Sequence, residues 1–428
     1  MAFSFVLECQ EGNMRLGLIG NPLAHSWSPE IHGFLKHVDY ELWPLEENEL
    51  DQFFEDKAFD GLNVTIPYKT AVIKYLDEID EDAGRMHAVN CIINENGRLK
   101  GYNTDILGLK RMMNGYGINK EGGAVAILGT GGASKAAAEA CRLSGWEYYL
   151  VSRSLKPGCI DYSELYDMQE EISTLINTTP VGMYPEVNET PVDLDRFTSL
   201  KYIVDVVANP VRTSLMYEGE LRGIKAYGGL EMLVGQALGA DEIFMDCDMD
   251  DSMICECVKE LTNKKLNIML IGMPCAGKTT VGGMLAEALG RPFIDMDQEI
   301  IKRIGMPISE FFAKKGEDAF RDIESDICRS VRDLNGTVIA SGGGVIKRKE
   351  NMVNVAHNCL VVWLDRDPEL LMPSDSRPLS TKRSDIYKLY NERKELYEMY
   401  SDARVSNNET AEAALEKILN IINTPDED

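Results

Sequence analysis

Residues 272–279 read GMPCAGKT, and this stretch decides the fold of the C-terminal part of the chain. It fits the pattern G-x-x-x-x-G-K-[ST], follows the apolar run IMLI at 268–271, and precedes a helical pattern at 281–289. A strand, a glycine-rich turn and a helix in this order predict a P-loop, whose backbone N–H groups and helix N-terminus surround phosphate oxygens. Lys278 is expected to reach the β- and γ-phosphates, and the Thr279 hydroxyl to ligate Mg²⁺. A chance match in a glycine-rich turn is the alternative.

A P-loop usually opens its domain, so the roughly 270 residues before it are expected to form something complete. The length of 428 residues predicts two or three domains. The net charge of −26 argues against a nucleic-acid partner and against an anionic membrane surface. The ten cysteines contain no C-x-x-C pair, which favours reduced thiols in a cytoplasmic protein. Residues 1–13 do not resemble a signal peptide, and no apolar run approaches the ~20 residues of a membrane helix.

Upstream, several extended stretches end in polar loops. An apolar strand pattern at 15–20 runs into NPLAHSWSP at 21–29, where Ser26 and Ser28 either bind a ligand or cap the next helix. The loop NVTIPYK at 63–69 places Lys69 directly after a strand, either in a site or in solvent. The segments AVNC at 88–91 and GYNTD at 101–105 follow the same pattern. Ligands of α/β sheets bind at such carboxyl ends of strands.

A second α/β unit begins near residue 124. The buried strand pattern VAIL at 125–128 leads into GTGGAS at 129–134, a weak form of the dinucleotide fingerprint G-x-G-x-x-G/A. The next strand ends in SRS at 152–154, where an NAD-binding protein would carry an acidic residue for the ribose hydroxyl. Arg153 at this position suits the 2′-phosphate of NADP, with a solvated arginine as the alternative.

Further strands are predicted at 175–180 and 202–207, followed by a long helical region that opens with GGLEMLVGQA at 228–237. An acidic stretch at 246–251 interrupts this region before a last helix that ends near residue 261. We interpret residues 262–265, TNKK, as the linker to the P-loop strand.

Taken together, these motifs resemble two enzyme families. From about residue 15 to 261 the chain resembles shikimate dehydrogenase, through NPLAHSWSP, NVTIPYK, AVN, YNTD, LGTGGAS, SRS and GGLEMLVGQA in family order. From residue 266 onward it resembles shikimate kinase, through the P-loop, FIDMD, FFAKKGEDAFR, SGGG, SRPL and RKELY. The chain therefore looks like a fusion of two consecutive enzymes of the shikimate pathway.

The first resemblance implies NADPH-dependent reduction of 3-dehydroshikimate to shikimate. Lys69 and Asp105 match the family's catalytic pair, an ammonium held against a carboxylate that can deliver a proton to the carbonyl oxygen. The residues that match its substrate contacts are Ser26, Ser28, Thr65, Lys69, Asn90, Thr104, Asp105 and Gln236. The residues that match its NADP contacts are Gly129, Gly131, Gly132, Ser152, Arg153, Ser154 and Gly229.

The second resemblance implies ATP-dependent phosphorylation of shikimate to shikimate 3-phosphate. Asp297 matches the acceptor for the attacking hydroxyl and is the candidate base, with Lys278 as the second catalytic residue. The positions that match ATP contacts are Gly272, Cys275, Ala276, Gly277, Lys278, Thr279, Thr280 and the lid arginine Arg377. The positions that match shikimate contacts are Asp297, Arg321, Gly342, Gly343, Gly344 and Arg393.

Within these sets, Thr279 and Asp295 match the residues associated with Mg²⁺. The two arginines Arg321 and Arg393 match a clamp on the substrate carboxylate, for which guanidinium forks suit better than lysine. Glu324, three residues after Arg321, is expected to hold that arginine in place.

These resemblances imply an α/β fold in three parts after an N-terminal extension at 1–13. Residues 14–106 and 229–261 are expected to form the substrate-binding domain of the dehydrogenase, and residues 107–228 a Rossmann-like NADP domain. Residues 262–265 are the linker, and residues 266–428 are expected to form a P-loop kinase domain with a parallel sheet.

Three departures from the family patterns leave alternatives open. Ala208 stands where the dehydrogenases usually have a substrate-contacting tyrosine, which suggests quinate as an alternative substrate. Ser152 replaces the usual asparagine before Arg153. Residues 371–373, LMP, stand in the short kinase lid where an arginine is expected. A metabolite-sensing regulator with one inactive half is the rival from another class, although the catalytic residues are intact. The sequence does not indicate an oligomeric state.

Overall fold

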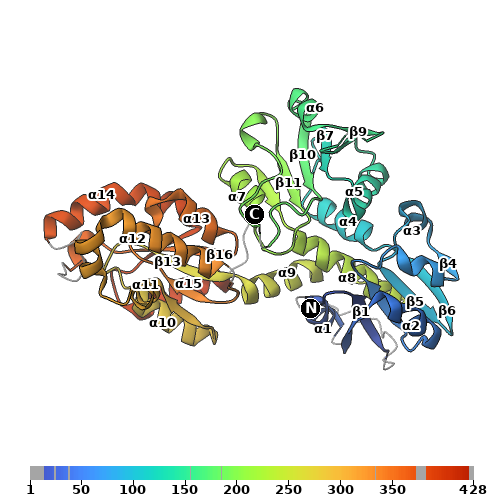
Figure 1. The fold of residues 1–428 in the computed structure, drawn as a ribbon, viewed down its shortest axis with the longest axis horizontal. Helices are drawn as coiled ribbons and strands as arrows, with labels where there is room; N and C mark the ends of the chain where they lie inside the picture. The colour runs from blue at the N-terminus through green and yellow to red at the C-terminus, as the bar shows by residue number, and fades with distance from the viewer. Residues whose placement is uncertain are drawn as a thin grey trace, which may run out of the picture. The chain divides into compact units, whose positions relative to one another are not determined.

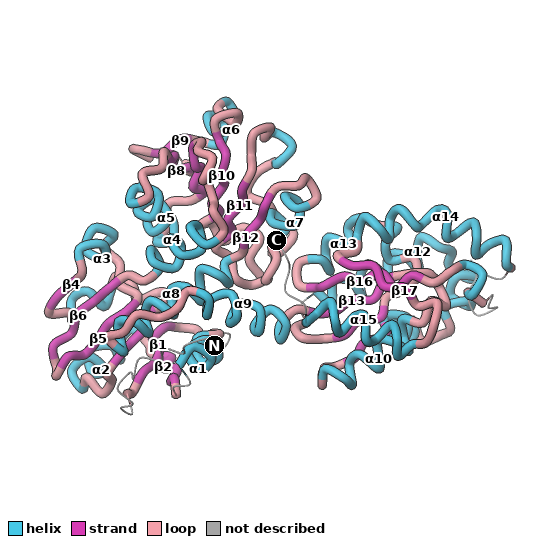
Figure 2. Tube along the Cα trace, turned by 180° about the vertical axis from the view of Figure 1, so that it is seen from behind, coloured by secondary structure: helices cyan, strands magenta, loops and turns pink. Residues whose placement is uncertain are grey.

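The computed structural model describes residues 14–23, 26–36, 39–154, 156–184, 186–332, 334–372 and 382–423. The chain divides into two compact units. The first is formed by Met1–Asn209 and Leu215–Glu260, and the second by Pro210–Ser214 and Leu261–Asp428. Among the described residues, the first unit contains two six-stranded sheets and the second contains one five-stranded sheet (Figures 1 and 2).

The first sheet has mixed strand directions. Its strands, in spatial order, are β2 (Tyr40–Pro44), β1 (Leu16–Gly20), β3 (Gly61–Val64), β5 (Cys91–Glu95), β6 (Arg98–Tyr102) and β4 (Glu78–Ile79). β1 pairs in parallel with β2 and β3, whereas β5 runs antiparallel to β3 and β6. The associated helices are α1 (Ser28–Lys36), η1 (Glu47–Glu49), α2 (Leu50–Asp56), η2 (Ala71–Tyr75) and α3 (Glu81–Met86).

Side chains alternate between the two faces of this sheet, as the period of two in a strand requires. Ile19, Leu62 and Val64 pack with α2 and η2 in one core. Leu16 and Cys91 pack on the other face against the end of α8 (Gly229–Met245). Both faces of the sheet are therefore covered, and both bury apolar side chains.

The second sheet is entirely parallel. Its order is β12 (Lys225–Tyr227), β11 (Tyr202–Asp205), β10 (Ile172–Asn177), β7 (Ala124–Leu128), β8 (Tyr148–Val151) and β9 (Cys159–Ile160). The helices α4 (Asp105–Gly115), α5 (Gly132–Leu143), α6 (Tyr162–Asp167) and α7 (Ser214–Glu220) and the short turn η3 (Leu194–Arg196) surround it. Val125 and Ile127 pack with α4 and α5, whereas Ala126 and Leu128 pack on the opposite face with α6 and α7.

Two glycines allow α8 to approach the rest of the first unit closely. A Cβ on Gly108 of α4 would lie 2.6 Å from Met232 O and 2.8 Å from Gln236 N. A Cβ on Gly229, at the start of α8, would lie 2.3 Å from Val206 O after β11. These contacts bring the start of α4, the start of α8 and the end of β11 close together.

Helix α9 (Ser252–Lys265) continues through the linker residues 262–265, past the helix end that we expected near residue 261. Leu266 N donates to Thr262 O, so the helical hydrogen bonding extends to the start of the next strand. The stretch is polar but contains no glycine or proline to end a helix. Its two lysines also interact favourably with the negative end of the helix dipole.

The third sheet is parallel and belongs to the second unit. Its order is β14 (Phe293–Asp295), β15 (Val338–Ala340), β13 (Asn267–Ile271), β16 (Cys359–Asp365) and β17 (Ala403–Ser406). The helices of this unit are α10 (Lys278–Leu289), α11 (Met296–Ile304), α12 (Ile308–Arg332), η4 (Val345–Lys347), α13 (Lys349–Ala356), η5 (Pro368–Leu370), α14 (Arg383–Tyr400) and α15 (Ala411–Asn423).

Strand β13 divides the core of the second unit. Ile268 and Leu270 pack with α10 and α15 on one face, and Met269 and Ile271 pack with α11 to α14 on the other. Figure 1 shows α12 to α14 and the pair α10 and α15 on opposite sides of this sheet. In the same unit, Arg212 N donates to His357 O at 3.0 Å. In the described parts of the whole chain, no helix is long and apolar enough to cross a membrane.

Candidate active sites

The P-loop forms the turn between β13 and α10, as the sequence predicts. Gly272 and Gly277 have φ angles of 143° and 97°, which favour glycine. A Cβ on Gly272 would lie 2.5 Å from Leu364 O, so the loop also passes tightly over β16. Lys278 is buried at the start of α10, and its Nζ donates to Gly272 O and Met273 O at 2.9 Å each. The ammonium therefore lies against the loop that it is expected to serve.

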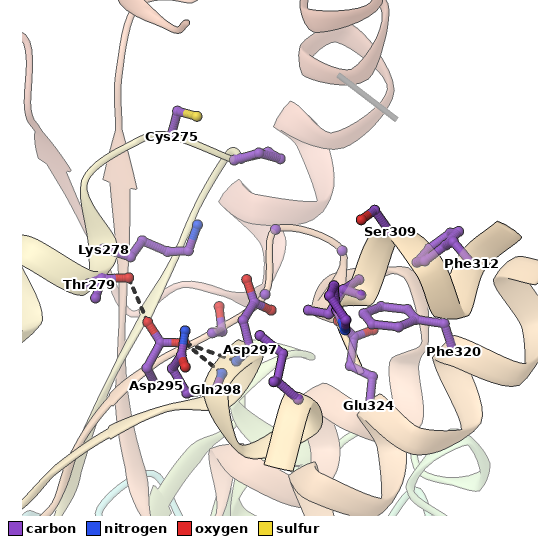
Figure 3. Close-up of a pocket in the computed structure, with 18 of the residues that line it drawn as sticks. Cys275, Lys278, Thr279, Asp295, Asp297, Gln298, Ser309, Phe312, Phe320 and Glu324 are labelled. Atoms are coloured by element: carbon purple, nitrogen blue, oxygen red, sulfur yellow. Dashed lines mark hydrogen bonds between the residues drawn. The ribbon is translucent and has the colours of Figure 1, made fainter. Parts of the chain in front are cut away.

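Thr279 and Asp295 are held together beside this loop (Figure 3). Thr279 Oγ1 donates to Asp295 Oδ2 at 2.6 Å. The other oxygen, Asp295 Oδ1, caps α11 by accepting from Asp297 N and Gln298 N at 3.0 and 3.2 Å. The cap fixes the carboxylate in one orientation. A hydroxyl and a carboxylate are hard oxygen donors of the kind that Mg²⁺ prefers.

A cavity of about 570 Å³ adjoins the P-loop. Its lining includes Lys278, Asp297, Arg321, Glu324 and Arg393, together with the glycines at 342–344. Phe312 and Phe320, whose ring centroids lie 4.7 Å apart, form an apolar wall. Figure 3 shows Lys278, Asp297 and Glu324 around the same space. Cationic, acidic and apolar groups thus meet where a small anion with hydroxyls could sit.

Arg321 is held by two carboxylates. Its Nη1 donates to Glu324 Oε2 at 2.6 Å, and its Nε and Nη2 donate to Glu317 Oε1 at 3.2 and 3.1 Å. Each Nη carries two hydrogens, so these two carboxylates leave one N–H on each Nη unused. A Cβ on Gly344 would lie 2.3 Å from both Nη atoms, which explains why glycine stands there.

Glu324 and Arg393 complete this side of the cavity. Burial raises the pKa of Glu324, against the opposing effect of Arg321. Within the described chain, Glu324 Oε1 has no hydrogen-bond partner. Arg393 Nη1 donates to Gly343 O at 2.7 Å, and Tyr397 OH donates to the same carbonyl at 2.5 Å. The lid arginine Arg377 lies outside the described residues.

In the first unit, a polar network centres on Asp105. Lys69 Nζ lies 2.6 Å from Asp105 Oδ2, and Asn90 Nδ2 donates to Asp105 Oδ1 at 2.8 Å. Asn90 Oδ1 accepts from Thr104 N at 2.7 Å, and Thr104 Oγ1 lies 3.3 Å from Gln236 Oε1 on α8. The side chains of Lys69 and Asp105 are 29% and 13% exposed, so a ligand could still reach them.

The loop that carries Ser26 and Ser28 and the loop that carries Thr65 lie at the carboxyl ends of two neighbouring strands of the first sheet. β1 and β3 are parallel neighbours that end together, so the loops after them meet, and Asn21 N donates to Ile66 O at 3.2 Å. Ser26 Oγ accepts from Ser28 N at 3.3 Å and donates to Ser28 Oγ at 3.2 Å. The two hydroxyls are thus already paired with each other at the start of α1.

The glycine loop of the second sheet leads from β7 into α5. Gly129 has a φ of 113°, and a Cβ there would lie 2.8 Å from Thr178 Oγ1. Gly131 is the N-cap residue of α5, and a Cβ on Gly131 or Gly132 would meet nothing within 4 Å. Beyond β8, Ser154 N donates to Ser152 Oγ at 3.3 Å, and Arg153 is exposed. This loop is therefore open where a phosphate would approach the helix N-terminus.

The comparisons with known proteins match a domain family in each of the two units. Residues 18–92 match the family model for the shikimate dehydrogenase substrate binding domain, and residues 274–423 match that for shikimate kinase. A shikimate dehydrogenase (NADP(+)) of Clostridium beijerinckii is 40% identical over 253 residues, which cover 55% of this chain and 94% of the relative. The chain belongs to the shikimate dehydrogenase family. A shikimate kinase domain follows in the same chain.

Solved structures support the dehydrogenase half. Shikimate Dehydrogenase 1 from Peptoclostridium difficile is 38% identical, with a TM-score of 0.52, and the match covers 57% of this chain and 97% of that one. A chorismate mutase/shikimate 5-dehydrogenase fusion protein from Clostridium acetobutylicum is 34% identical, with a TM-score of 0.53, covering 57% and 96%. Shikimate 5-dehydrogenase from Thermus thermophilus, solved with NADP(H) and shikimate, is 29% identical, with a TM-score of 0.54, covering 58% and 99%.

Sequence reasoning missed several residues that the structure places at these sites. Lys156 Nζ donates to Thr130 Oγ1 at 2.7 Å, so a second cation lies beside the glycine loop of the dehydrogenase half. Asn103 Oδ1 accepts from Asp105 N at 3.1 Å, and Glu317 holds Arg321 in the kinase half. Asn103 stands inside the YNTD motif, and Glu317 stands inside FFAKKGEDAFR four residues before Arg321, so both could have been found there, whereas nothing in the local sequence distinguishes Lys156.

Proposed function

We propose that this chain catalyses two reactions of the shikimate pathway. The dehydrogenase half reduces 3-dehydroshikimate to shikimate with NADPH, and the kinase half transfers the γ-phosphoryl group of ATP to the 3-hydroxyl of shikimate. The observation that supports the dehydrogenase reaction is the Lys69–Asp105 pair, in which Asn90 also donates a hydrogen bond to Asp105. The observation that supports the kinase reaction is a single cavity, which is lined by the P-loop, Asp297, Arg321 and Arg393.

In the dehydrogenase half, Lys69 is the proposed proton donor. NADPH, when bound, supplies the hydride that the carbonyl carbon requires. The ammonium of Lys69 delivers the proton to the carbonyl oxygen and stabilises the negative charge that develops there. Asp105 holds that ammonium in place, and Asn90 fixes the other oxygen of Asp105. Ser26, Ser28, Thr65, Thr104 and Gln236 are the proposed contacts for the carboxylate and the ring hydroxyls.

The residues around the second sheet fit NADP(H). Gly131 and Gly132 leave room for a pyrophosphate at the start of α5, and Gly129, with its positive φ, forms the tight turn that precedes them. Arg153 and Lys156 offer positive charge for the 2′-phosphate, with Ser152 and Ser154 as hydroxyl donors beside them. Gly229 lies where α8 meets the end of β11, and we assign it to the nicotinamide end of the site.

In the kinase half, Asp297 is the proposed acceptor for the proton of the attacking hydroxyl. Lys278 and the backbone of 272–280 bind the phosphates of ATP, and Thr279 and Asp295 would hold Mg²⁺, which neutralises phosphate charge. The remaining N–H groups of Arg321, together with Arg393, bind the shikimate carboxylate. This leaves Asp297 to orient the ring hydroxyl towards the phosphates.

A purified-protein assay tests both proposals separately. NADPH oxidation with 3-dehydroshikimate and ATP consumption with shikimate should each be observed, and shikimate should also reduce NADP⁺ in the reverse direction. Quinate is the second candidate for the dehydrogenase half, because Ala208 lacks a side chain long enough to contact the ring. A higher kcat/KM for quinate than for shikimate would replace the first proposal. If one half bound shikimate without turning it over, the alternative of a metabolite-sensing regulator with one inactive half would be favoured.

A further inference from the structure

A buried polar cluster lies beside the dehydrogenase site, formed by His32 of α1, Tyr40 of β2, Asn63 of β3 and Asp241 of α8. His32 and Asp241 are 1% and 0% exposed, and His32 Nδ1 lies 2.6 Å from Asp241 Oδ1. In the described structure, His32 Nε2 and Asp241 Oδ2 have no hydrogen-bond partner. Half-satisfied buried polar groups cost stability, and an apolar pair could fill the same space. The pair therefore points to a role beyond packing.

The cluster continues from His32 towards the site. The His32 ring stacks on Tyr40 with centroids 4.1 Å apart and an interplanar angle of 9°. Tyr40 OH donates to Asn63 Oδ1 at 2.6 Å. Burial, followed by the charge of Asp241, raises the pKa of Tyr40 well above its ordinary value, so the hydroxyl keeps its proton and donates. Asn63 Nδ2 in turn donates to Asn90 O at 3.3 Å.

The two ends of this cluster reach the proposed substrate contacts by different routes. Through Asn63 it meets the main chain of Asn90, whose side chain binds Asp105. Through the His32–Asp241 pair it joins α1 to α8. α1 begins at Ser28, one helical turn before His32, and α8 carries Gln236 five residues before Asp241. The cluster thus fixes the spacing between Ser28, Gln236 and Asn90.

We propose that His32, Tyr40 and Asp241 are positioning residues that set the substrate affinity of the dehydrogenase. They touch neither substrate nor cofactor in this assignment, and act by holding α1 and α8 at the separation that a ring between Ser28 and Gln236 requires. The inference rests on the proposed function of the Lys69–Asp105 site. It predicts a loss mainly in shikimate binding, because the glycine loop and Arg153 lie on the second sheet and share no residue with the cluster, and Gly229, the NADP contact on α8, lies twelve residues before Asp241.

Three substitutions distinguish a positioning role of the cluster from a general effect on the stability of the protein. Asp241→Asn keeps an oxygen that accepts from His32 Nδ1, whereas Asp241→Leu fills the space without any acceptor. Ser173→Ala is the matched control, because Ser173 is buried in β10 of the second sheet and donates to Asn119 Oδ1 at 2.7 Å. For each protein, the KM for shikimate, the KM for NADP⁺, the kcat, the kinase activity and the Tm are measured.

We expect Asp241→Leu to raise the KM for shikimate in the dehydrogenase reaction on the order of tenfold, because small misplacements of binding groups are costly. The KM for NADP⁺ and the kinase activity should stay within about twofold, and Asp241→Asn should restore the KM for shikimate. Ser173→Ala should lower the Tm without changing that KM. An unchanged KM for shikimate in Asp241→Leu overturns the proposal, as does a parallel loss in Ser173→Ala.

Failure of the proposed function is distinguishable from failure of this inference. If the wild type had no dehydrogenase turnover, the assigned reaction would be wrong. Calorimetric titration of shikimate, in an Arg321→Ala background that removes the kinase clamp, would then compare wild type, Asp241→Leu and Asp241→Asn directly. A weaker Kd in Asp241→Leu alone supports the positioning role, and equal or absent binding in all three overturns it.

Discussion

Lys69 Nζ lies 2.6 Å from Asp105 Oδ2, although the two residues are 36 positions apart in the sequence. Each is placed by a local constraint. Lys69 follows the turn in which Tyr68 N donates to Thr65 O, and Asp105 is the first residue of α4. A carboxylate at a helix N-terminus is stabilised by the helix dipole. The pair is therefore preformed and needs no rearrangement to hold an ammonium in a defined position.

Lys69→Ala should lower the kcat of the dehydrogenase about 10²- to 10⁴-fold, the usual contribution of a positioned acid or base. The kinase activity should stay within about twofold, since the two sites share no residue. Steady-state assays of both reactions measure this. Lys74→Ala, at an exposed ion pair with Asp51, is the control and should change neither. A loss below tenfold in Lys69→Ala would contradict the assignment.

Cofactor preference should favour NADP⁺ over NAD⁺, because Arg153 and Lys156 both lie near the end of β8 beside the glycine loop. A charge-assisted hydrogen bond contributes roughly 1.5–3 kcal/mol, or about 10- to 150-fold in affinity. Arg153→Ala and Lys156→Ala should each raise the KM for NADP⁺ while leaving that for NAD⁺ nearly constant. Equal kcat/KM values for the two cofactors in the wild type would refute this.

Lys278→Ala should abolish phosphoryl transfer and leave shikimate oxidation within about twofold. Lys278 is the P-loop lysine, and its ammonium already lies against Gly272 O and Met273 O. ATP consumption and NADP⁺ reduction are followed in the same preparation. Lys302→Ala, which removes an exposed lysine paired with Glu299, is the matched control. ATP turnover that persisted in Lys278→Ala would show that the P-loop assignment is wrong.

The sequence predicted the family and the two parallel sheets because strand, turn and helix patterns around glycine loops are local. It could not predict groups that act across the fold. Asp241 meets His32 over 209 residues of sequence, and Lys347 reaches Glu317 over 30 residues. Lys156 reaches Thr130 only once β8 lies beside β7. The predicted helix end near residue 261 was wrong, because α9 continues to Lys265 and polarity alone does not end a helix.

Acid should destabilise the second unit through His357. Burial, together with Arg332 and Arg212, lowers the pKa of His357 to about 4 in the folded state. The unfolded chain, with an ordinary histidine pKa near 6.5, binds the proton first. The free energy of unfolding should therefore fall as the pH decreases from ~6.5 to ~4, by at most about 3 kcal/mol. It should be unaffected by this group above that range.

Denaturant unfolding at pH 7.5 and at pH 5 measures this change in the free energy of unfolding. The ATP-dependent activity of the kinase half serves as the readout of its folded fraction. His357→Gln removes the titrating group and should reduce the difference between the two pH values. His87→Gln, at the exposed C-cap residue of α3, serves as the control and should leave the difference unchanged. An equal pH dependence in wild type and His357→Gln would exclude His357 as the cause.

Shikimate should pass between the two reactions through free solution. Guiding an anion over a protein surface needs a continuous positive path, and this chain carries a net charge of −26. Screening beyond ~10 Å at ordinary salt would weaken any residual guidance. Because α9 runs as one helix through residues 262–265, cutting there would disturb structure. A better comparison keeps the chain intact and uses Lys69→Ala and Lys278→Ala, which should each retain one reaction.

Wild type and a mixture of the two variants, matched in active dehydrogenase and kinase sites, are started with 3-dehydroshikimate, NADPH and ATP. In the mixture, shikimate made on one molecule must be released before another phosphorylates it. The lag before shikimate 3-phosphate appears should be the same in both samples, and added shikimate labelled with ¹³C should mix fully into the product. A much shorter lag in the wild type, with little dilution by the label, would show that shikimate is handed on directly and that the charge argument fails.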